Sequence, residues 1–149
     1  MRYNDALDVS SYIINYCTKR DYLMSNLKLQ KILYFSQAYF LLSKHEPCFD
    51  DTIEAWDIGP VIPAAYKEYK KYGSGNIWIM NHCLEEDCYN DIILDDDKKL
   101  ICAVVDRFAD YSAADLAKIT RNQSPWMDAY VPNRHNEITV KAIEEYFSA

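Results

Sequence analysis

Cysteine and histidine side chains are the residues of this chain that could act as nucleophiles, bases or metal ligands. The chain has five cysteines and three histidines. Cys48 with His135 could supply a thiol nucleophile and a base, which would make the protein a small thiol-dependent hydrolase or transferase. Almost any chain with this many cysteines and histidines offers such a combination, however. The enzyme therefore stays an alternative hypothesis, and we name no catalytic residue.

His82, Cys83 and Cys88 lie close together in the sequence and resemble half of a zinc site. Structural zinc sites use two closely spaced ligand pairs, and the sequence offers no second pair. The chain also lacks a glycine-rich phosphate loop, an H-E-x-x-H motif, a G-x-S-x-G motif and an EF-hand pattern. We therefore expect no metal ion and no other cofactor.

The charge of the chain narrows the choice of partners. Twenty-three acidic residues against 16 basic ones give a net charge of −7 at pH 7. Nucleic-acid binding depends on clustered lysine and arginine, so we expect no direct contact with nucleic acid, whereas a basic protein partner fits. The sequence shows neither a signal peptide nor a long uncharged apolar run. We expect a cytoplasmic protein that does not contact a membrane.

Composition and apolar periodicity predict a mainly α-helical fold. Half of the 149 residues are apolar, which suits one compact domain over residues 1–149. Only three glycines are present, so tight turns should be few, and helices are favoured over a hairpin-rich β fold. Apolar residues that recur every three or four positions predict six to seven helices, and residues 49–57 predict a small extended element.

The central helix is predicted over residues 26–43, which contain neither glycine nor proline. Its apolar residues occupy almost every side of the helix, and a helix of that kind lies inside a protein. Lys28, Gln30 and Lys31 are polar positions on this buried helix, so at least one of them should find a specific partner. We favour internal hydrogen bonds over contacts with another protein.

Capping residues and prolines predict where the other helices begin. Asn4 is available as the N-cap of a first helix over Asp5–Lys19, and Pro60 suits the first position of a third helix. Further helix starts are expected at Asp96 or Asp97, at Ser112 with Asp115 as its capping-box partner, at Ser124 before Pro125, and at Thr139.

Three segments of the chain match the motifs of one known family. Residues 27–38 (LKLQKILYFSQA) match its central-helix motif, and residues 47–61 (PCFDDTIEAWDIGPV) match an arm followed by a turn. Residues 116–126, which end in Ser-Pro-Trp, match a shorter C-terminal motif. Together these segments resemble the SocA-like antitoxin domain, also called Panacea, which includes phage-associated GepA-like proteins. The resemblance covers nearly the whole chain.

The resemblance implies an antitoxin that is encoded beside a toxin, often on a prophage, and that neutralises it by direct binding. Some members present the toxin to an ATP-dependent protease. Arg121 stands where the family usually has histidine, and Ile58 stands where an aromatic residue is common. Because arginine is no titratable base, this departure argues against an enzyme. If the histidine of other members contacts the toxin, the departure also implies a different toxin specificity. A phage-associated scaffold without a toxin and a homodimeric assembly both stay open.

The expected partner surface is the turn that contains Gly59-Pro60. A rigid turn would present a preorganised surface, and its neighbouring carboxylates would offer negative charge to a basic toxin. Trp126 would either support this turn or extend the surface, since tryptophan dominates the energetics of many interfaces. Purely structural roles for the tryptophans are the alternative. The candidate partner-binding residues are Glu54, Trp56, Asp57, Gly59, Pro60, Arg121 and Trp126.

Overall fold

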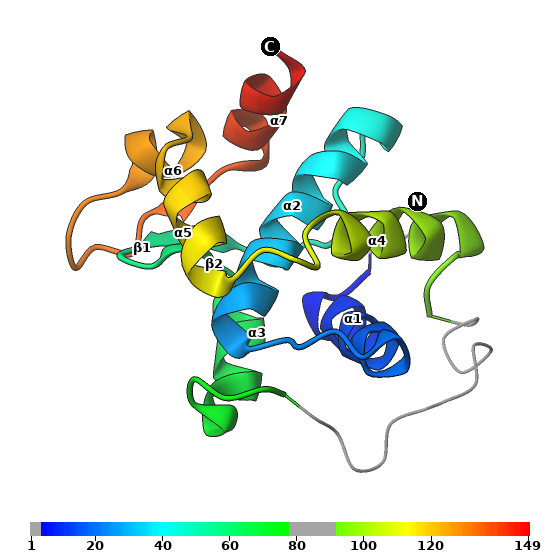
Figure 1. Ribbon diagram of the computed structural model, residues 1–149. Coiled ribbons are helices and arrows are strands. Elements are labelled where there is room, and N and C mark those ends of the chain that lie inside the picture. Colours follow the sequence, from blue (N-terminus) through cyan, green and yellow to red (C-terminus); the bar gives the residue numbers. More distant parts are fainter. Residues whose placement is uncertain (1–3, 78–91) are drawn as a thin grey trace.

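Seven α-helices, one 3-10 helix and a small sheet make up residues 4–77 and 92–149, the parts of the chain that the computed structural model describes (Figure 1). The predicted mainly α-helical fold with a small extended element is confirmed. In chain order the elements are α1 (Ala6–Arg20), α2 (Asn26–Lys44), β1 (Ile53–Trp56), β2 (Gly59–Val61), α3 (Pro63–Tyr69), η1 (Lys70–Tyr72), α4 (Asp95–Arg107), α5 (Ala113–Arg121), α6 (Ser124–Ala129), β3 (Glu137–Ile138) and α7 (Val140–Ser148).

Helix α2 lies at the centre of this arrangement and packs against α1, α3, α4, α5, α7 and β2 (Figure 1). Ser25 caps its N-terminus by accepting a hydrogen bond from the backbone N–H of Lys28. His45, in the left-handed conformation, ends it. Most side chains of α2 are buried, so the prediction of a buried central helix is confirmed.

The polar side chains of α2 bind the segments that surround it. Lys28 Nζ donates to the carbonyl oxygen of Ala109 at 2.8 Å, and Lys31 Nζ donates to that of Pro60 at 3.0 Å. The side chain of Gln30 accepts a hydrogen bond from the backbone N–H of Ile62 at 2.9 Å. We expected a specific partner for at least one of these residues, and all three form internal hydrogen bonds.

The three strands form an antiparallel sheet in the order β2-β1-β3. Strands β1 and β2 pair so that Trp56 lies opposite Gly59, which leaves Asp57 and Ile58 as a two-residue turn. Ile138 of β3 pairs with Ile53 on the other side of β1. The segment that we expected to be extended is thus the central strand and part of a hairpin.

The prediction that Pro60 begins the third helix is wrong. Pro60 lies in β2 opposite Ala55, and α3 begins at Pro63. A proline can occupy an edge strand because it lacks only the N–H that a further strand would bind. Pro63 then takes the first helical position, where a missing N–H does no harm. Both prolines are compatible with a first helical turn, and the pairing of β2 with β1 places the helix start at the second of them.

Two predicted N-caps are also wrong. Asp5, not Asn4, caps α1, because the Asp5 carboxylate accepts a hydrogen bond from the backbone N–H of Leu7. The predicted caps Asp96 and Asp97 lie inside the first turn of α4, where their negative charges face the positive end of the helix dipole. For α1 the acidic neighbour of Asn4 takes the capping role, whereas α4 begins after Leu94, which makes no side-chain capping bond.

The remaining helix starts agree more closely with the sequence. Ser112 and Asp115 form the predicted capping box of α5, and Thr139 caps α7 by accepting a hydrogen bond from Ala142 N–H. Ser124 is the first residue of α6 rather than the residue before it, and Gln123 takes the capping position.

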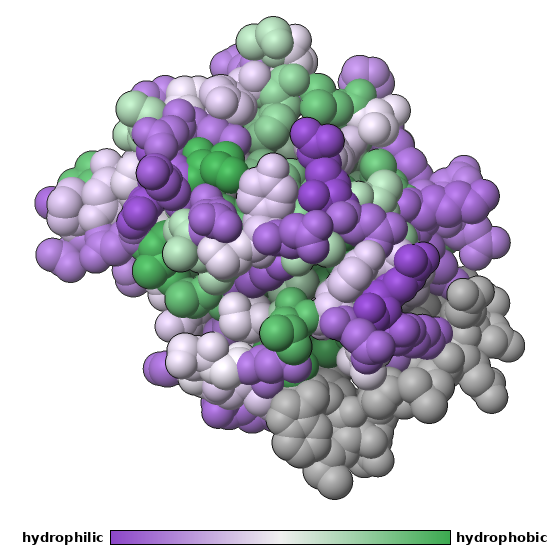
Figure 2. All heavy atoms as spheres, viewed as in Figure 1, coloured by the Kyte–Doolittle hydropathy of each residue, from purple (hydrophilic) through white to green (hydrophobic). Residues whose placement is uncertain are grey.

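Hydrophilic residues cover much of the face seen in Figure 2, and its apolar residues form scattered patches rather than one continuous surface. No helix within residues 4–77 and 92–149 combines the length and the apolar character that crossing a membrane requires.

Candidate functional site

The segment Trp56–Pro60, which we call the Trp56 turn, is held by side chains from three helices. Trp126 of α6 donates its indole N–H to the carbonyl oxygen of Trp56 at 2.7 Å. Arg121 of α5 donates to the carbonyl oxygen of Asp57 at 3.0 Å. The bond from Lys31 of α2 to the Pro60 carbonyl is the third. Three backbone carbonyls of one short turn are therefore fixed from outside it.

Gly59 is the residue that lets Lys31 reach the Trp56 turn. Its φ is +104°, a conformation that residues with a side chain rarely adopt. A Cβ atom at this position would lie 2.9 Å from Lys31 Cε and 3.0 Å from Thr120 Oγ1. The turn thus needs glycine both for its backbone conformation and for its close approach to α2 and α5.

Lys31 is a buried amine, only 1% exposed. Burial, with a smaller contribution from the positive charge of Arg121, lowers its pKa from 10.5 to about 7. No carboxylate among the described residues forms an ion pair with Lys31. The interior of the protein therefore contains an amine whose charge is opposed by its surroundings, held there by one hydrogen bond to the Trp56 turn.

Aromatic rings surround the Trp56 side chain. The ring of His135 stacks on it, with centroids 4.4 Å apart and planes at 14°, and Tyr66 lies 5.0 Å away on α3. Trp126 and Tyr130 form a second stacked pair, with centroids 4.3 Å apart. Of these contacts, the stacking of His135 on Trp56 joins segments that are far apart in the sequence.

Two carboxylates adjoin these rings. Glu54 accepts a hydrogen bond from the Trp56 indole N–H at 2.9 Å. Asp57 is exposed and accepts a hydrogen bond from the Tyr130 hydroxyl, and this bond raises the pKa of Tyr130. The Trp56 turn therefore carries negative charge beside aromatic surface.

A hollow of about 260 Å³ opens beside the Trp56 turn, and we call it the aromatic hollow. Four aromatic residues line it, and Asp57 is also among its lining residues. Two of its residues, Asn133 and His135, have positive φ values of 64° and 51°, an uncommon backbone conformation outside glycine. The lining residues are Trp56, Asp57, Ile58, Tyr66, Tyr130, Asn133 and His135.

The structure brings most of the predicted site residues together around the Trp56 turn. Trp126 supports the turn, which was one of the two roles that we considered for it. Gly59 and Pro60 are buried, so they shape the turn rather than face outward. Lys28 and Gln30 bind other segments, and of the three polar α2 residues only Lys31 reaches the turn. Whether any of these residues contacts a partner stays a prediction.

Sequence reasoning missed Tyr66, Tyr130 and His135 as parts of this site. For the two tyrosines, the one signal in the sequence is the large number of tyrosines in the chain, 13, since a tyrosine side chain combines apolar surface with a polar tip and suits an interface. No spacing rule connects residues of α3 and of the segment between α6 and β3 to a turn near residue 57.

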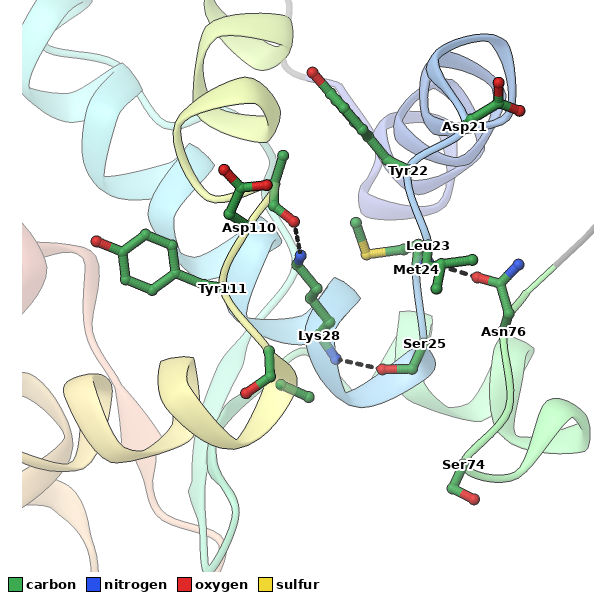
Figure 3. A pocket seen from close by; sticks show the side chains of 13 residues that line it. Asp21, Tyr22, Leu23, Met24, Ser25, Lys28, Ser74, Asn76, Asp110 and Tyr111 are labelled. Carbon is green, nitrogen blue, oxygen red and sulfur yellow. Dashed lines mark hydrogen bonds between the residues drawn. The ribbon is translucent and has the colours of Figure 1, made fainter.

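A second hollow, of about 510 Å³, lies between the α1–α2 link, the segment after η1 and the α4–α5 link (Figure 3). Lys28 reaches across it to the Ala109 carbonyl, and burial lowers the pKa of Lys28. Leu23 at its rim is 75% exposed. Because the chain continues from Asn76 and Ile77 into residues 78–91, which the structure does not describe, we assign no ligand to this hollow.

Neither the thiol nor the metal hypothesis gains support from the described residues. Cys48 is fully buried, and burial raises its pKa well above the ordinary value. Reactive thiols have lowered pKa values and partial exposure. Within residues 4–77 and 92–149 no cluster of three histidine, cysteine or acidic residues could hold a metal ion. His82, Cys83 and Cys88 lie outside the described residues.

Comparisons with known proteins agree with the motifs. A family model described as the SocA-like antitoxin, Panacea domain, matches residues 29–127. The protein Antitoxin SocA of Caulobacter vibrioides (strain NA1000 / CB15N) is 35% identical over 83 residues, which are 56% of this chain and 43% of that protein. The chain thus matches less than half the length of this relative. No solved structure gives a significant match.

Proposed function

The chain belongs to the SocA-like antitoxin family, and from this membership we propose that it neutralises a toxin by binding it directly through the Trp56 turn. In this proposal the protein acts by occupying a surface of the toxin, so it needs no catalytic group and no cofactor. Its partner is the protein encoded beside it. We place the pair in the cytoplasm, where an antitoxin and a newly made toxin meet.

The observation that carries the proposal is the fixation of the Trp56 turn by three side-chain donors. Binding usually costs free energy because loops and side chains lose freedom at the interface. A turn whose carbonyls are already held by Trp126, Arg121 and Lys31 has lost that freedom before the partner arrives. Such a turn is suited to recognition by shape.

Charge supports the same surface. The chain carries a net charge of −7, and Asp57 is exposed on the turn. Complementary charge speeds the encounter of two proteins and disfavours wrong partners. A toxin with a basic surface is therefore the partner that fits this turn.

Co-expression tests the proposal. The product of the neighbouring gene should stop growth when it is made alone, and this chain should restore growth. With Asp57→Arg, cells should tolerate at least tenfold less inducer of the toxin gene, because the substitution reverses the charge on the turn. Its thermal midpoint should fall only slightly, since Asp57 is exposed and the substitution removes one hydrogen bond, from Tyr130, whose net contribution to stability is small.

Asp128→Arg is the matched control, because Asp128 is also exposed but lies on α6 outside the aromatic hollow. It should rescue like the natural protein. Full rescue by Asp57→Arg would show that the Trp56 turn is not part of the interface with the toxin. A neighbouring gene product that does not slow growth would contradict the antitoxin role itself.

Direct binding must also be separated from removal of the toxin by an ATP-dependent protease. The two purified proteins should co-elute from a size-exclusion column in the absence of any protease. Rescue in cells without co-elution would contradict neutralisation by occupancy.

A further inference from the structure

We propose that the aromatic hollow is a socket for one arginine side chain of the partner protein. This inference rests on the proposed function, since it names the chemical group that the antitoxin would recognise. It adds Tyr66, Tyr130 and His135 to the residues of the binding surface.

The walls of the hollow suit a flat cation. Trp56, Tyr66, Tyr130 and His135 all contribute rings to it. A guanidinium group is attracted to the faces of tryptophan and tyrosine rings, and it stacks on them because it is planar. The ammonium group of lysine carries the same charge but is not planar, so arginine is the better match for a space bounded by several rings.

The carboxylate at the hollow is free to accept further hydrogen bonds. Asp57 receives one from the Tyr130 hydroxyl, and an ionised carboxylate can accept about four. Arg121 is the nearby cation, but its bond goes to the backbone carbonyl of Asp57, and Asp57 forms no ion pair with any described residue. A guanidinium in the hollow could therefore bind Asp57 through two parallel N–H groups.

The size and rigidity of the hollow fit one side chain. Its volume of about 260 Å³ lies below the range of roughly 300–1,000 Å³ that is typical of sites for whole small molecules. Three lining residues, Trp56, Asp57 and Ile58, belong to the Trp56 turn, which three helices hold, and Glu54 accepts a hydrogen bond from the indole N–H of Trp56. The socket is therefore formed before a partner binds.

Titration of the full chain with N-acetyl-arginine methylamide, followed by two-dimensional ¹H–¹⁵N NMR, tests the proposal. The assigned Trp56 indole N–H signal should shift along a saturable curve with a dissociation constant in the millimolar range. The citrulline analogue has nearly the same shape without the charge, and it should bind at least tenfold more weakly. The lysine analogue should fall between the two.

Asp57→Asn should weaken binding of the arginine probe about tenfold, because it removes the charge and keeps the shape. Asp128→Asn removes an exposed carboxylate outside the hollow and should leave the titration unchanged. His135→Ala removes one wall and should weaken binding of arginine more than binding of lysine. Equal shifts with arginine and citrulline, or shifts that Asp57→Asn does not reduce, would overturn the proposal.

A negative result in this titration can be distinguished from a failure of the proposed function. Rescue of cells from the neighbouring gene product without a saturable response to the arginine probe would overturn the socket and leave the antitoxin role intact. Saturable arginine binding beside a neighbouring gene product without toxicity would support the socket and contradict the antitoxin role.

Discussion

Replacing Lys31 by methionine should make the protein more stable and less able to neutralise its toxin. Lys31 is buried, and its pKa falls from 10.5 to about 7 in the folded protein. At pH 7 this difference corresponds to about 4 kcal/mol of lost stability, since each pKa unit is worth about 1.4 kcal/mol and half of the folded molecules have already released the proton. Methionine fills a similar space without a charge.

The substitution also removes the hydrogen bond from Lys31 to the carbonyl oxygen of Pro60. A buried carbonyl left without its donor costs about 1–3 kcal/mol. The two effects oppose each other, and the charge effect is the larger. We expect Lys31→Met to raise the free energy of unfolding by about 2 kcal/mol at pH 7, while the Trp56 turn loses one of its three attachments.

Urea denaturation at two pH values measures the first effect. The pKa of Lys31 is lower in the folded than in the unfolded protein, so the ammonium reduces stability fully below pH 7, and this reduction disappears as the pH rises toward 10.5. Between pH 7 and pH 9 the natural protein should therefore gain about 2 kcal/mol relative to Lys31→Met. The comparison stops at pH 9 because tyrosines titrate near pH 10.

Growth rescue measures the second effect, and Lys28→Met is its matched control. Lys28 lies on the same helix and is also buried, but it binds the Ala109 carbonyl rather than the Trp56 turn. Lys28→Met should keep full rescue, whereas Lys31→Met should lose part of it. A less stable Lys31→Met protein, or a stability difference that does not change between pH 7 and pH 9, would refute the reasoning.

Two further predictions concern Gly59 and Cys48. Gly59→Ala should lower the free energy of unfolding by about 3 kcal/mol, because it combines a strained backbone with close contacts to Lys31 Cε and Thr120 Oγ1. Gly73 also has a positive φ, but a Cβ there would meet no atom within 4 Å, so Gly73→Ala should lower the free energy of unfolding clearly less. Equal losses for the two variants in thermal denaturation would show that the close approach at Gly59 is unimportant. Cys48 should react with iodoacetamide only as fast as the folded protein opens, since its thiol is buried and its pKa is raised. Mass spectrometry of the Cys48 peptide, with the half-buried Cys102 as the reference, measures this rate. Rapid labelling of Cys48 would support the hypothesis of a thiol-dependent enzyme.

The central helix could be predicted well because its signal is local. An uninterrupted run of helix formers that is apolar on nearly every side has few alternatives to burial, and the polar residues on it then needed internal partners. The starts of the other helices were less certain. Pro60 and Pro63 are both compatible with a first helical turn, and only the pairing of β2 with β1 decides between them.

The Trp56 turn and its surroundings show where local reasoning ends. The motif around residues 56–60 and the motif that ends in Trp126 are visible in the sequence, but the bond between Trp126 and the Trp56 carbonyl joins residues 70 positions apart. The aromatic hollow depends on more such contacts, including the stacking of His135 on Trp56. Neither periodicity nor capping carries information about pairs of this kind.

Several features of this protein that oppose stability occur at the same place. Lys31 is a buried amine that pairs with no carboxylate of the described residues, and it binds the Trp56 turn. Gly59, at φ +104°, is part of this turn, and His135, at φ +51°, stacks on its tryptophan. Uncommon backbone conformations and buried charges persist where the surrounding structure requires them, and they tend to gather at functional sites. If stability alone shaped this region, methionine at position 31 would serve better than lysine. That a lysine nevertheless holds the turn is the physical reason to look for the partner surface here, and the opposed effects expected of Lys31→Met make that inference measurable.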